Sequence, residues 1–328
     1  MDALGNWSWS ELPRALRPAG LGAAEIADIF WIFVAVCMVV WCLVVLGLLA
    51  ALFFRRAERT GTHLQPDDRS GERTASLIVI VCVGLTAAVL VALTGLSFVT
   101  DRSLASVAGE KSLTIELTGW QWWWQARYAD SDPNRVFYTA NEIHVPVDAV
   151  VTLKLSAGDV IHSFWVPELS GKQDLIPGQQ NTQRIVALKA GIYRGQCAEF
   201  CGLQHARMAL RVIAESPPDF RAWYEKQLAK ATEPKSAEAR SGKDVFLTRS
   251  CVMCHTIVGT LANSKAGPDL THVASRGTIA AATLPFTRGA LGAWIADPQA
   301  IKPGSKMPPS NLDPDELNAV IAYLEGLK

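Results

Sequence analysis

The sequence of 328 residues has no net charge, because 31 lysines and arginines are balanced by 31 aspartates and glutamates. A chain without an excess of positive charge gives no support for a nucleic-acid partner. Methionine and histidine are also scarce, with five and six residues, and the sequence has no internal repeat. The length suggests two or three domains. Bulk composition therefore leaves the function open, and the informative features are a few local clusters.

Charge is also absent from two long stretches, residues 29–54 and 74–100. Each is long enough to cross a hydrocarbon core of about 30 Å, which takes about 20 apolar residues. A buried core helix is the alternative, but two such runs so close together disfavour it. The first run follows a polar and mixed segment and ends at Arg55, which is unlike a cleaved signal peptide. The two runs therefore predict a pair of transmembrane helices.

The arginines around these runs predict an orientation in the membrane. The segment before the first run holds Arg14 and Arg17. The loop between the runs holds more: Arg55, Arg56, Arg59, Arg69 and Arg73. Because positive loops stay in the cytoplasm, we expect both termini, and everything after residue 101, on the periplasmic or outer side.

The rest of the chain changes character twice. Residues 112–215 contain short runs of alternating apolar and polar residues, which predict a β-sandwich or Greek-key barrel. Residues 217–230 have helical spacing, and residues 313–327 predict a closing helix. The predicted parts are an external segment 1–27, a transmembrane hairpin 28–100, a β-sandwich domain 101–230, a linker 231–240 and an all-α domain 241–328.

Seven cysteines divide into three groups. Cys37, Cys42 and Cys82 lie in the apolar runs, where cysteine behaves as a small hydrophobe. The other four form two pairs, Cys197 with Cys201 and Cys251 with Cys254. An exported domain allows disulfides, so each pair could be a simple covalent staple.

The first pair belongs to the segment GQCAEFCGLQHARM, residues 195–208, which also holds His205 and Met208. Two thiolates, an imidazole and a thioether form a soft ligand set that favours copper. The spacing would fit one helix face, but glycines interrupt it and a strand-like run precedes it, which favours a loop joining two strands. His162, in DVIHSFWVPELSG, would be a core histidine if it stood alone. It is the nitrogen donor that this cluster needs.

These motifs together resemble subunit II of the haem-copper cytochrome c oxidases. The resemblance covers about residues 25–230 and includes the two membrane helices, GWQWWW, DVIHSFWVPEL and the C-x-E-x-C-x3-H-x2-M loop. It implies a cupredoxin-like domain with a dinuclear copper centre. The implied ligands are the bridging thiolates of Cys197 and Cys201, terminal His162 and His205, weak axial Met208 and the carbonyl of Glu199. It also implies that the Glu199 side chain serves a magnesium site shared with the catalytic subunit. A disulfide would explain neither His205 nor Met208.

The resemblance assigns two further residues. Trp122 in GWQWWWQ, residues 119–125, matches the surface tryptophan through which the family passes electrons to copper. The family usually has His in place of Trp120 and often Tyr in place of Trp123. For most of these tryptophans the simpler interpretation is a strand packed into the sandwich core. Glu72 matches a glutamate near the mouth of a proton channel, the alternative being a solvated charge beside Arg73.

The second cysteine pair lies in CVMCH, residues 251–255, which predicts covalent attachment of a c-type haem. Cys251 and Cys254 would bind the vinyl groups and His255 would ligate the iron. A redox dithiol would need a βαβ context that is absent here. Met307, in GSKMPPS, is the predicted sixth ligand, with His272 as the runner-up. This region resembles the class I cytochrome c fold, including GPDL at residues 267–270.

A subunit II fused to a cytochrome c resembles the haem-fused oxidases of bacteria. The expected function is that of a terminal respiratory oxidase subunit in the bacterial inner membrane. Electrons would pass from cytochrome c or a cytochrome bc complex to the haem, the Trp122 region, the copper centre and then subunit I. There, oxygen reduction is coupled to proton translocation, and subunit III and membrane lipid are further expected partners. A quinol oxidase subunit lacks the copper ligands, and nitrous oxide reductase lacks the membrane helices. A stand-alone membrane-anchored electron carrier or copper-handling protein remains an alternative.

Overall fold

The computed structural model describes residues 14–55, 69–105 and 113–328. The predicted cytoplasmic loop, with Arg56 and Arg59, lies outside the described residues, as do residues 1–13. The helical hairpin, residues 25–106, is one compact unit. The described residues before it and the chain after it form the other.

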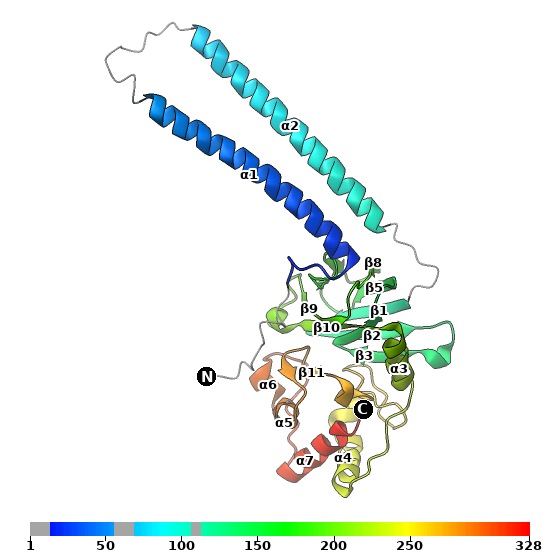
Figure 1. The fold of residues 1–328 in the computed structure, drawn as a ribbon. Helices are drawn as coiled ribbons and strands as arrows, with labels where there is room; N and C mark the ends of the chain where they lie inside the picture. Colours follow the sequence, from blue (N-terminus) through cyan, green and yellow to red (C-terminus); the bar gives the residue numbers. More distant parts are fainter. Residues whose placement is uncertain (1–13, 56–68, 106–112) are drawn as a thin grey trace. The chain divides into compact units, whose positions relative to one another are not determined.

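The two uncharged runs form the two long helices in Figure 1, α1 (Leu21–Arg55) and α2 (Arg69–Ala105). Each extends beyond the predicted limits. The apolar spans, 34 residues in α1 and 32 residues in α2, are long enough to cross a membrane. In the most apolar part of each helix almost no residue is buried within the chain. Phe54 and Val91 are 76% and 73% exposed. A soluble protein would bury such helices in its core, so the buried-helix alternative is wrong and lipid is the solvent that suits these surfaces.

The strands after residue 112 form a sandwich of two five-stranded sheets, which we call the sandwich domain (residues 113–230). The first sheet has the order β3-β2-β1-β5-β8, and the second β4-β10-β9-β6-β7. Their bounds are β1 Leu113–Trp120, β2 Trp123–Ala129, β3 Phe137–Ala140, β4 Glu142–Pro146, β5 Val151–Ala157, β6 His162–Trp165, β7 Gln173–Leu175, β8 Asn181–Ile185, β9 Gly191–Cys197 and β10 Ala209–Glu215. Helix α3 (Pro217–Gln227) follows.

Alternation explains why these segments become strands. In β1, Ile115 and Leu117 are fully buried while their neighbours Glu116 and Thr118 are only partly buried. The strand β1 pairs parallel with β5 and antiparallel with β2. The segment GWQWWWQ is not a single strand, as the simpler interpretation had it. Its two halves pair Trp120 with Trp123 across a turn at Gln121 and Trp122. The turn brings Trp122 out of the sheet ladder.

The residues around the start of α1 hydrogen bond to the sandwich domain. Ala19 and Gly20 donate backbone hydrogen bonds to the carbonyl of Glu168, and Leu188 donates to the carbonyl of Ala19. A Cβ on Gly20 would lie 2.5 Å from the carbonyl oxygen of Leu169, so only glycine fits this approach. Residues 19–24 are thereby attached to the sandwich domain and belong to the same compact unit.

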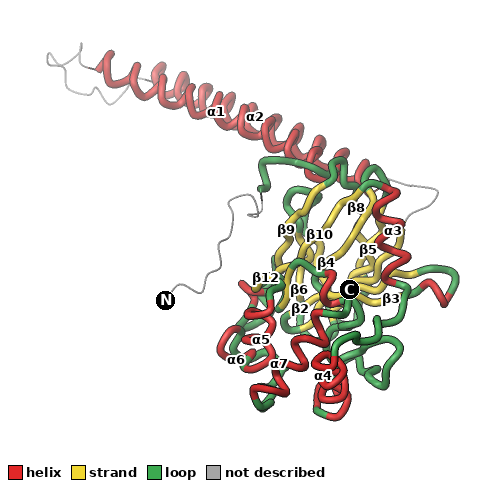
Figure 2. The backbone as a smooth tube through the Cα atoms, turned by 60° about the horizontal axis from the view of Figure 1, so that its bottom comes forward, coloured by secondary structure: helices red, strands yellow, loops and turns green. Residues whose placement is uncertain are grey.

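The chain ends in a helical domain (residues 237–328). Its elements are α4 Ala237–Thr248, α5 Arg288–Ala296, α6 Pro298–Ile301, α7 Pro314–Glu325 and the short strands β11 Thr278–Ile279 and β12 Leu284–Pro285. Helix α4 begins at Ala237, before the predicted linker ends at residue 240, because Ser236 caps it through the amide of Ala239. In Figures 1 and 2, α4 and α7 lie side by side. A Cβ on Gly242 of α4 would overlap the carbonyl of Ala319 of α7, so the close crossing requires glycine.

Candidate metal centre

The segment 195–208 forms a loop between two neighbouring strands, as its glycines predict. Cys197 ends β9 and Ala209 begins β10, and a backbone hydrogen bond from Cys197 to Met208 (2.9 Å) joins the two ends of the loop. His162 begins the adjacent strand β6, whose Phe164 pairs with Cys197. The sheet therefore places a histidine from one strand beside cysteines from another.

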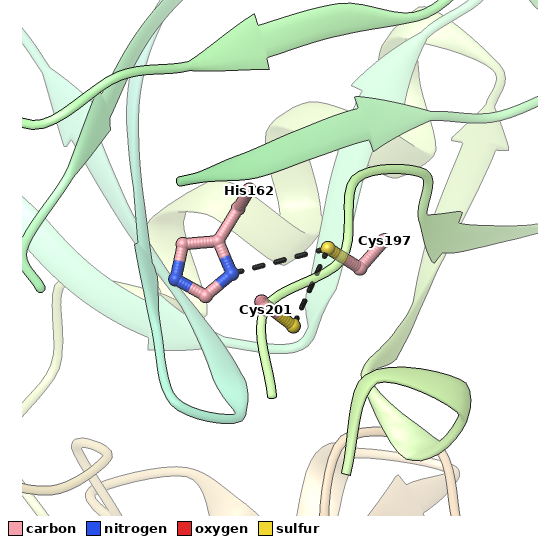
Figure 3. A group of neighbouring side chains, drawn as sticks. All are labelled: His162, Cys197 and Cys201. Carbon is pink, nitrogen blue, oxygen red and sulfur yellow. Dashed lines mark hydrogen bonds between the residues drawn. The ribbon is translucent and has the colours of Figure 1, made fainter. Parts of the chain in front are cut away.

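The predicted copper ligands form a continuous chain of contacts. Cys197 Sγ lies 3.7 Å from Cys201 Sγ and 3.9 Å from His162 Nδ1, and these three side chains face one another in Figure 3. Cys201 Sγ lies 3.6 Å from His205 Nδ1 and 3.8 Å from Met208 Sδ. The carbonyl oxygen of Glu199 lies 3.2 Å from Cys197 Sγ. The structure thus brings all six predicted ligands to one place.

Both cysteines are free thiols and each is 2% exposed. Their separation far exceeds the S–S bond length of about 2.05 Å, so they form no disulfide. The hydrogen bond with Cys201 lowers the pKa of Cys197, and the same contact raises the pKa of Cys201. The pair gives up one proton easily and the second reluctantly. A soft cation bound to both sulfurs, through metal–thiolate bonds of about 2.3 Å, would neutralise the negative charge of the two thiolates.

Asp159 completes the site, and sequence reasoning missed it. Its Oδ1 lies 3.0 Å from His162 Nε2, which directs the other ring nitrogen, Nδ1, toward Cys197. Its Oδ2 accepts from the backbone amide of Gln121 at 2.8 Å and from Lys306 Nζ at 3.2 Å. Burial opposes ionisation, but these hydrogen bonds, that with His162 foremost, lower the pKa of Asp159. The only signal in the sequence is an aspartate three residues before the histidine.

Trp122 lies directly beside the metal loop. Its Nε1 donates to the carbonyl oxygen of Cys201 at 2.9 Å, and so does Gln121 Nε2. One hydrogen bond therefore separates the indole from a ligand residue. Trp122 is 8% exposed, so it is not a surface residue as the resemblance implied. Gly304 of the helical domain covers its ring, because a Cβ there would lie 3.5 Å from Trp122 Cη2.

The two remaining acidic candidates lie at exposed positions. The Glu199 side chain is 38% exposed and its Oε2 lies 3.4 Å from Lys172 Nζ. Its backbone carbonyl and its side chain thus face different surroundings. Glu72 lies exposed in the first turn of α2, beside Arg73 in a shallow surface depression.

The CVMCH motif lies on the turn η4 (Ser250–Met253) and just after it. Cys251 and Cys254 are free thiols. His255 Nδ1 lies 2.8 Å from the carbonyl oxygen of Pro268, which leaves Nε2 as the nitrogen available to a metal. A Cβ on Gly267 would lie 3.0 Å from His255 Cε1, so the GPDL loop packs directly on the imidazole. These features fit the proximal side of a covalent haem.

The two candidate sixth ligands differ in their surroundings. Met307 is half-buried on the loop between α6 and α7, and Gln299 Nε2 donates to its carbonyl oxygen at 2.8 Å. His272 is 6% exposed, and its ring nitrogens lie 3.1 Å and 3.0 Å from the carbonyl oxygens of Lys328 and Ala229. Both ring nitrogens thus face carbonyl oxygens of the main chain, which argues against His272 as a ligand.

Comparisons with known proteins match both of the domains that carry these sites. The family of the cytochrome c oxidase subunit II periplasmic domain matches residues 113–215, and the cytochrome c family matches residues 239–328. Cytochrome c oxidase subunit 2 of Alkalihalophilus pseudofirmus is 33% identical over 317 residues, which cover 96% of this chain and 90% of the relative. The chain belongs to the cytochrome c oxidase subunit 2 family.

Other members match over part of their length. Cytochrome c oxidase subunit 2 of Bacillus subtilis is 31% identical over 229 residues, 67% of this chain and 63% of the relative. The crystal structure of the periplasmic domain of subunit II of cytochrome oxidase from Bradyrhizobium japonicum is 34% identical, with a TM-score of 0.34, and covers 36% of this chain and 95% of that chain. The family matches and the relative from Alkalihalophilus pseudofirmus identify the chain as an oxidase subunit with two apolar helices, a cupredoxin-like sandwich and a helical cytochrome c domain. The matched domains imply copper in the first and haem in the second.

Proposed function

We propose that this chain accepts electrons for a terminal respiratory oxidase of the bacterial inner membrane. Electrons would pass from an external cytochrome c or cytochrome bc complex to the haem of the helical domain. From there they would pass through Trp122 and the copper centre to subunit I. In that subunit each oxygen molecule takes four electrons and four protons to form two water molecules, coupled to proton translocation.

The observation that carries this proposal is the convergence of the six ligand residues around two free thiols. Cys197 and Cys201 would bridge two copper ions, with His162, His205, Met208 and the Glu199 carbonyl completing the set. Copper supplies one-electron transfer there. The buried loop holds the donors in place before and after transfer, and Asp159 fixes the orientation of His162. A preformed site needs little rearrangement when its charge changes.

The helical domain would hold one haem through thioether bonds to Cys251 and Cys254, with His255 and Met307 as axial ligands. Haem supplies one-electron transfer at a potential raised by His/Met ligation. Burial lowers the pKa of His255, which keeps the imidazole neutral and able to ligate. Arg276 is 9% exposed, and its Nε has no hydrogen-bond partner in the described chain. A haem carboxylate is a group that could satisfy this donor.

The remaining assignments concern partners and the membrane. We infer that both termini, the sandwich domain and the helical domain lie on the periplasmic side, between subunits I and III and the external donor. Glu199 would share a magnesium ion with subunit I, and Glu72 would lie near a proton channel. We also propose the domain boundaries that the sequence predicts.

Gentle isolation of the chain from membranes tests this function. We expect subunit I to accompany it and the preparation to consume oxygen with reduced cytochrome c. Isolation without a haem-copper partner and without oxygen uptake would favour the stand-alone electron carrier. Met208→Leu should alter the near-infrared copper band and leave the haem spectrum unchanged. Met307→Ala should convert the haem from low spin to another ligation state.

A further inference from the structure

The helical domain contacts the sandwich domain at the face that carries Trp122. Lys302 lies in this contact and is 3% exposed. Its Nζ donates to the carbonyl oxygen of Trp122 at 2.8 Å and to that of Ala280 at 3.2 Å. Lysine is almost never fully buried unless it has partners. The partners of this lysine are main-chain oxygens, one of them at the tryptophan beside the copper loop.

A second buried ionisable side chain points the opposite way across the contact. Glu142 of β4 is 2% exposed. Its carboxylate accepts from the amide of Gly277 at 3.1 Å, from the amide of Thr278 at 2.9 Å and from Thr278 Oγ1 at 2.8 Å. Each domain therefore inserts one buried side chain that hydrogen bonds to the main chain of the other, Lys302 to Trp122 and Glu142 to Gly277 and Thr278. Such bonds are directional and specify one orientation.

The turn between β11 and β12 lies between these two contacts. Ala280, Ala281 and Ala282 have φ values of 54°, 58° and 53°, in the left-handed region that alanine disfavours. The carbonyl of Ala280 accepts from Lys302, that of Ala281 from the amide of Ala209 at 3.3 Å, and that of Ala282 from Arg194 Nη1 at 3.3 Å. Two of these three donors belong to the sandwich domain. The docked surroundings thus hold a backbone conformation that is costly in isolation.

The segment that leads to Met307 lies on the metal loop itself. Gln204 Nε2 donates to the carbonyl of Pro303 at 2.7 Å, and Arg207 donates to the carbonyl of Ile301. Gly304 lies against the Trp122 ring. The contact therefore joins the proposed haem loop to the proposed copper loop through two hydrogen bonds, a part-buried one from Gln204 and an exposed one from Arg207. The part-buried bond is far less sensitive to salt than surface charge pairs.

We propose that Lys302 and Glu142 are positioning residues that hold the helical domain in one fixed orientation over Trp122. Trp122 then serves only this chain's own haem, and external donors must reduce the helical domain first. A haem held by the helical domain would supply one electron to copper held by the sandwich domain, without release of the helical domain. This inference rests on the proposed function for the identity of the two redox centres. The docking itself can be tested without either of them.

The first test measures docking after the connection between the domains is cut. A protease site introduced at residues 233–235 of the full chain is cleaved, and the two parts are followed by size-exclusion chromatography in about 0.5 M salt, where the Debye length is only a few ångströms. The parts of the otherwise unchanged protein should remain together. Glu142→Ala leaves two amides and a hydroxyl without an acceptor, and should weaken the association about 30-fold or more.

Lys265→Met is the matched control for Lys302→Met. Lys265 Nζ also reaches across the contact, to the hydroxyl of Tyr138 at 3.3 Å, but at an exposed position. We expect Lys302→Met to weaken the association and Lys265→Met to leave it unchanged. Separation of the unaltered parts would overturn the inference, and so would equal behaviour of the two lysine variants.

The second test measures which centre an external donor reduces. In the intact chain, flash-reduced donor should reduce the haem first, and copper should follow in a first-order step that is independent of donor concentration. In Glu142→Ala and Lys302→Met, a direct copper phase that depends on donor concentration should appear. Copper and haem content are measured in every sample. A direct phase in the unaltered chain with both centres present refutes the docking inference, whereas a missing centre refutes the proposed function.

Discussion

The role of Asp159 gives the sharpest prediction about the metal centre. Its carboxylate contacts His162 Nε2 at 3.0 Å and three further donors, so it fixes the direction in which His162 Nδ1 points. Replacing a carboxylate that orients a ligating histidine costs about 10- to 100-fold in metal affinity. Asp159→Asn keeps the shape of the side chain and one acceptor oxygen, so its loss of copper affinity should lie near the lower limit of this range. Asp159→Ala removes every hydrogen bond of the side chain, so its loss of affinity should lie near the upper limit.

The assay is competition for copper between the protein and a chelator at fixed pH, followed by the copper absorption and by metal analysis. Glu116→Gln is the control, since Glu116 is a carboxylate of the same domain that pairs at the surface with Arg127 at 2.8 Å. An exposed pair of this kind contributes little to stability. Copper affinities of both Asp159 variants within about twofold of the unaltered protein would refute the reasoning, because the expected loss is at least tenfold.

Three further predictions concern packing, pH and electron transfer. Gly242→Ala should lower the free energy of unfolding of the helical domain by about 1–3 kcal/mol through overlap with Ala319, measured by denaturant titration of the haem absorption. Gly289→Ala, with open space around its Cβ, should be neutral or stabilising by up to about 1 kcal/mol. Burial lowers the pKa of Lys302 from 10.5 to about 7, so docking releases a proton. Association of the cleaved parts should therefore tighten as pH rises from about 7 to 10.5, by at most about tenfold per pH unit. Below pH 7 the association should no longer depend on pH through this lysine, and Lys302→Met should lack the dependence at every pH. An equal pH dependence of association in Lys302→Met would contradict its assignment to Lys302. Trp122→Phe removes the hydrogen bond to Cys201 and should slow haem-to-copper transfer in flash experiments, whereas an unchanged rate would exclude the indole from the path.

The local motifs could be predicted from the sequence because their spacing reflects local geometry. Cys197, Cys201, His205 and Met208 lie on one loop, so a short stretch of sequence contains most of the site. The apolar runs and the alternating strands follow from the solvent that each side chain meets. His162 comes from another strand, and it was added because the cluster was short of nitrogen donors.

The features of the structure that could not be predicted depend on contacts between residues distant in the sequence. Nothing around Asp159 distinguishes it from other surface aspartates until β6 and the Trp122 turn come together. Lys302 and Glu142 each appear as ordinary charged residues, and their burial depends on the docking of two domains. Trp122 was expected at the surface for the same reason. The attachment of Ala19 and Gly20 to the sandwich domain also involves partners far along the chain.

The content of copper and haem per chain tests the central claim most directly. The intact chain is purified from membranes, and copper is measured by elemental analysis and covalent haem by its pyridine spectrum after denaturation. The account predicts two copper ions and one covalent haem for each chain. A Cys197–Cys201 disulfide without copper, or a Cys251–Cys254 pair without haem, would contradict it.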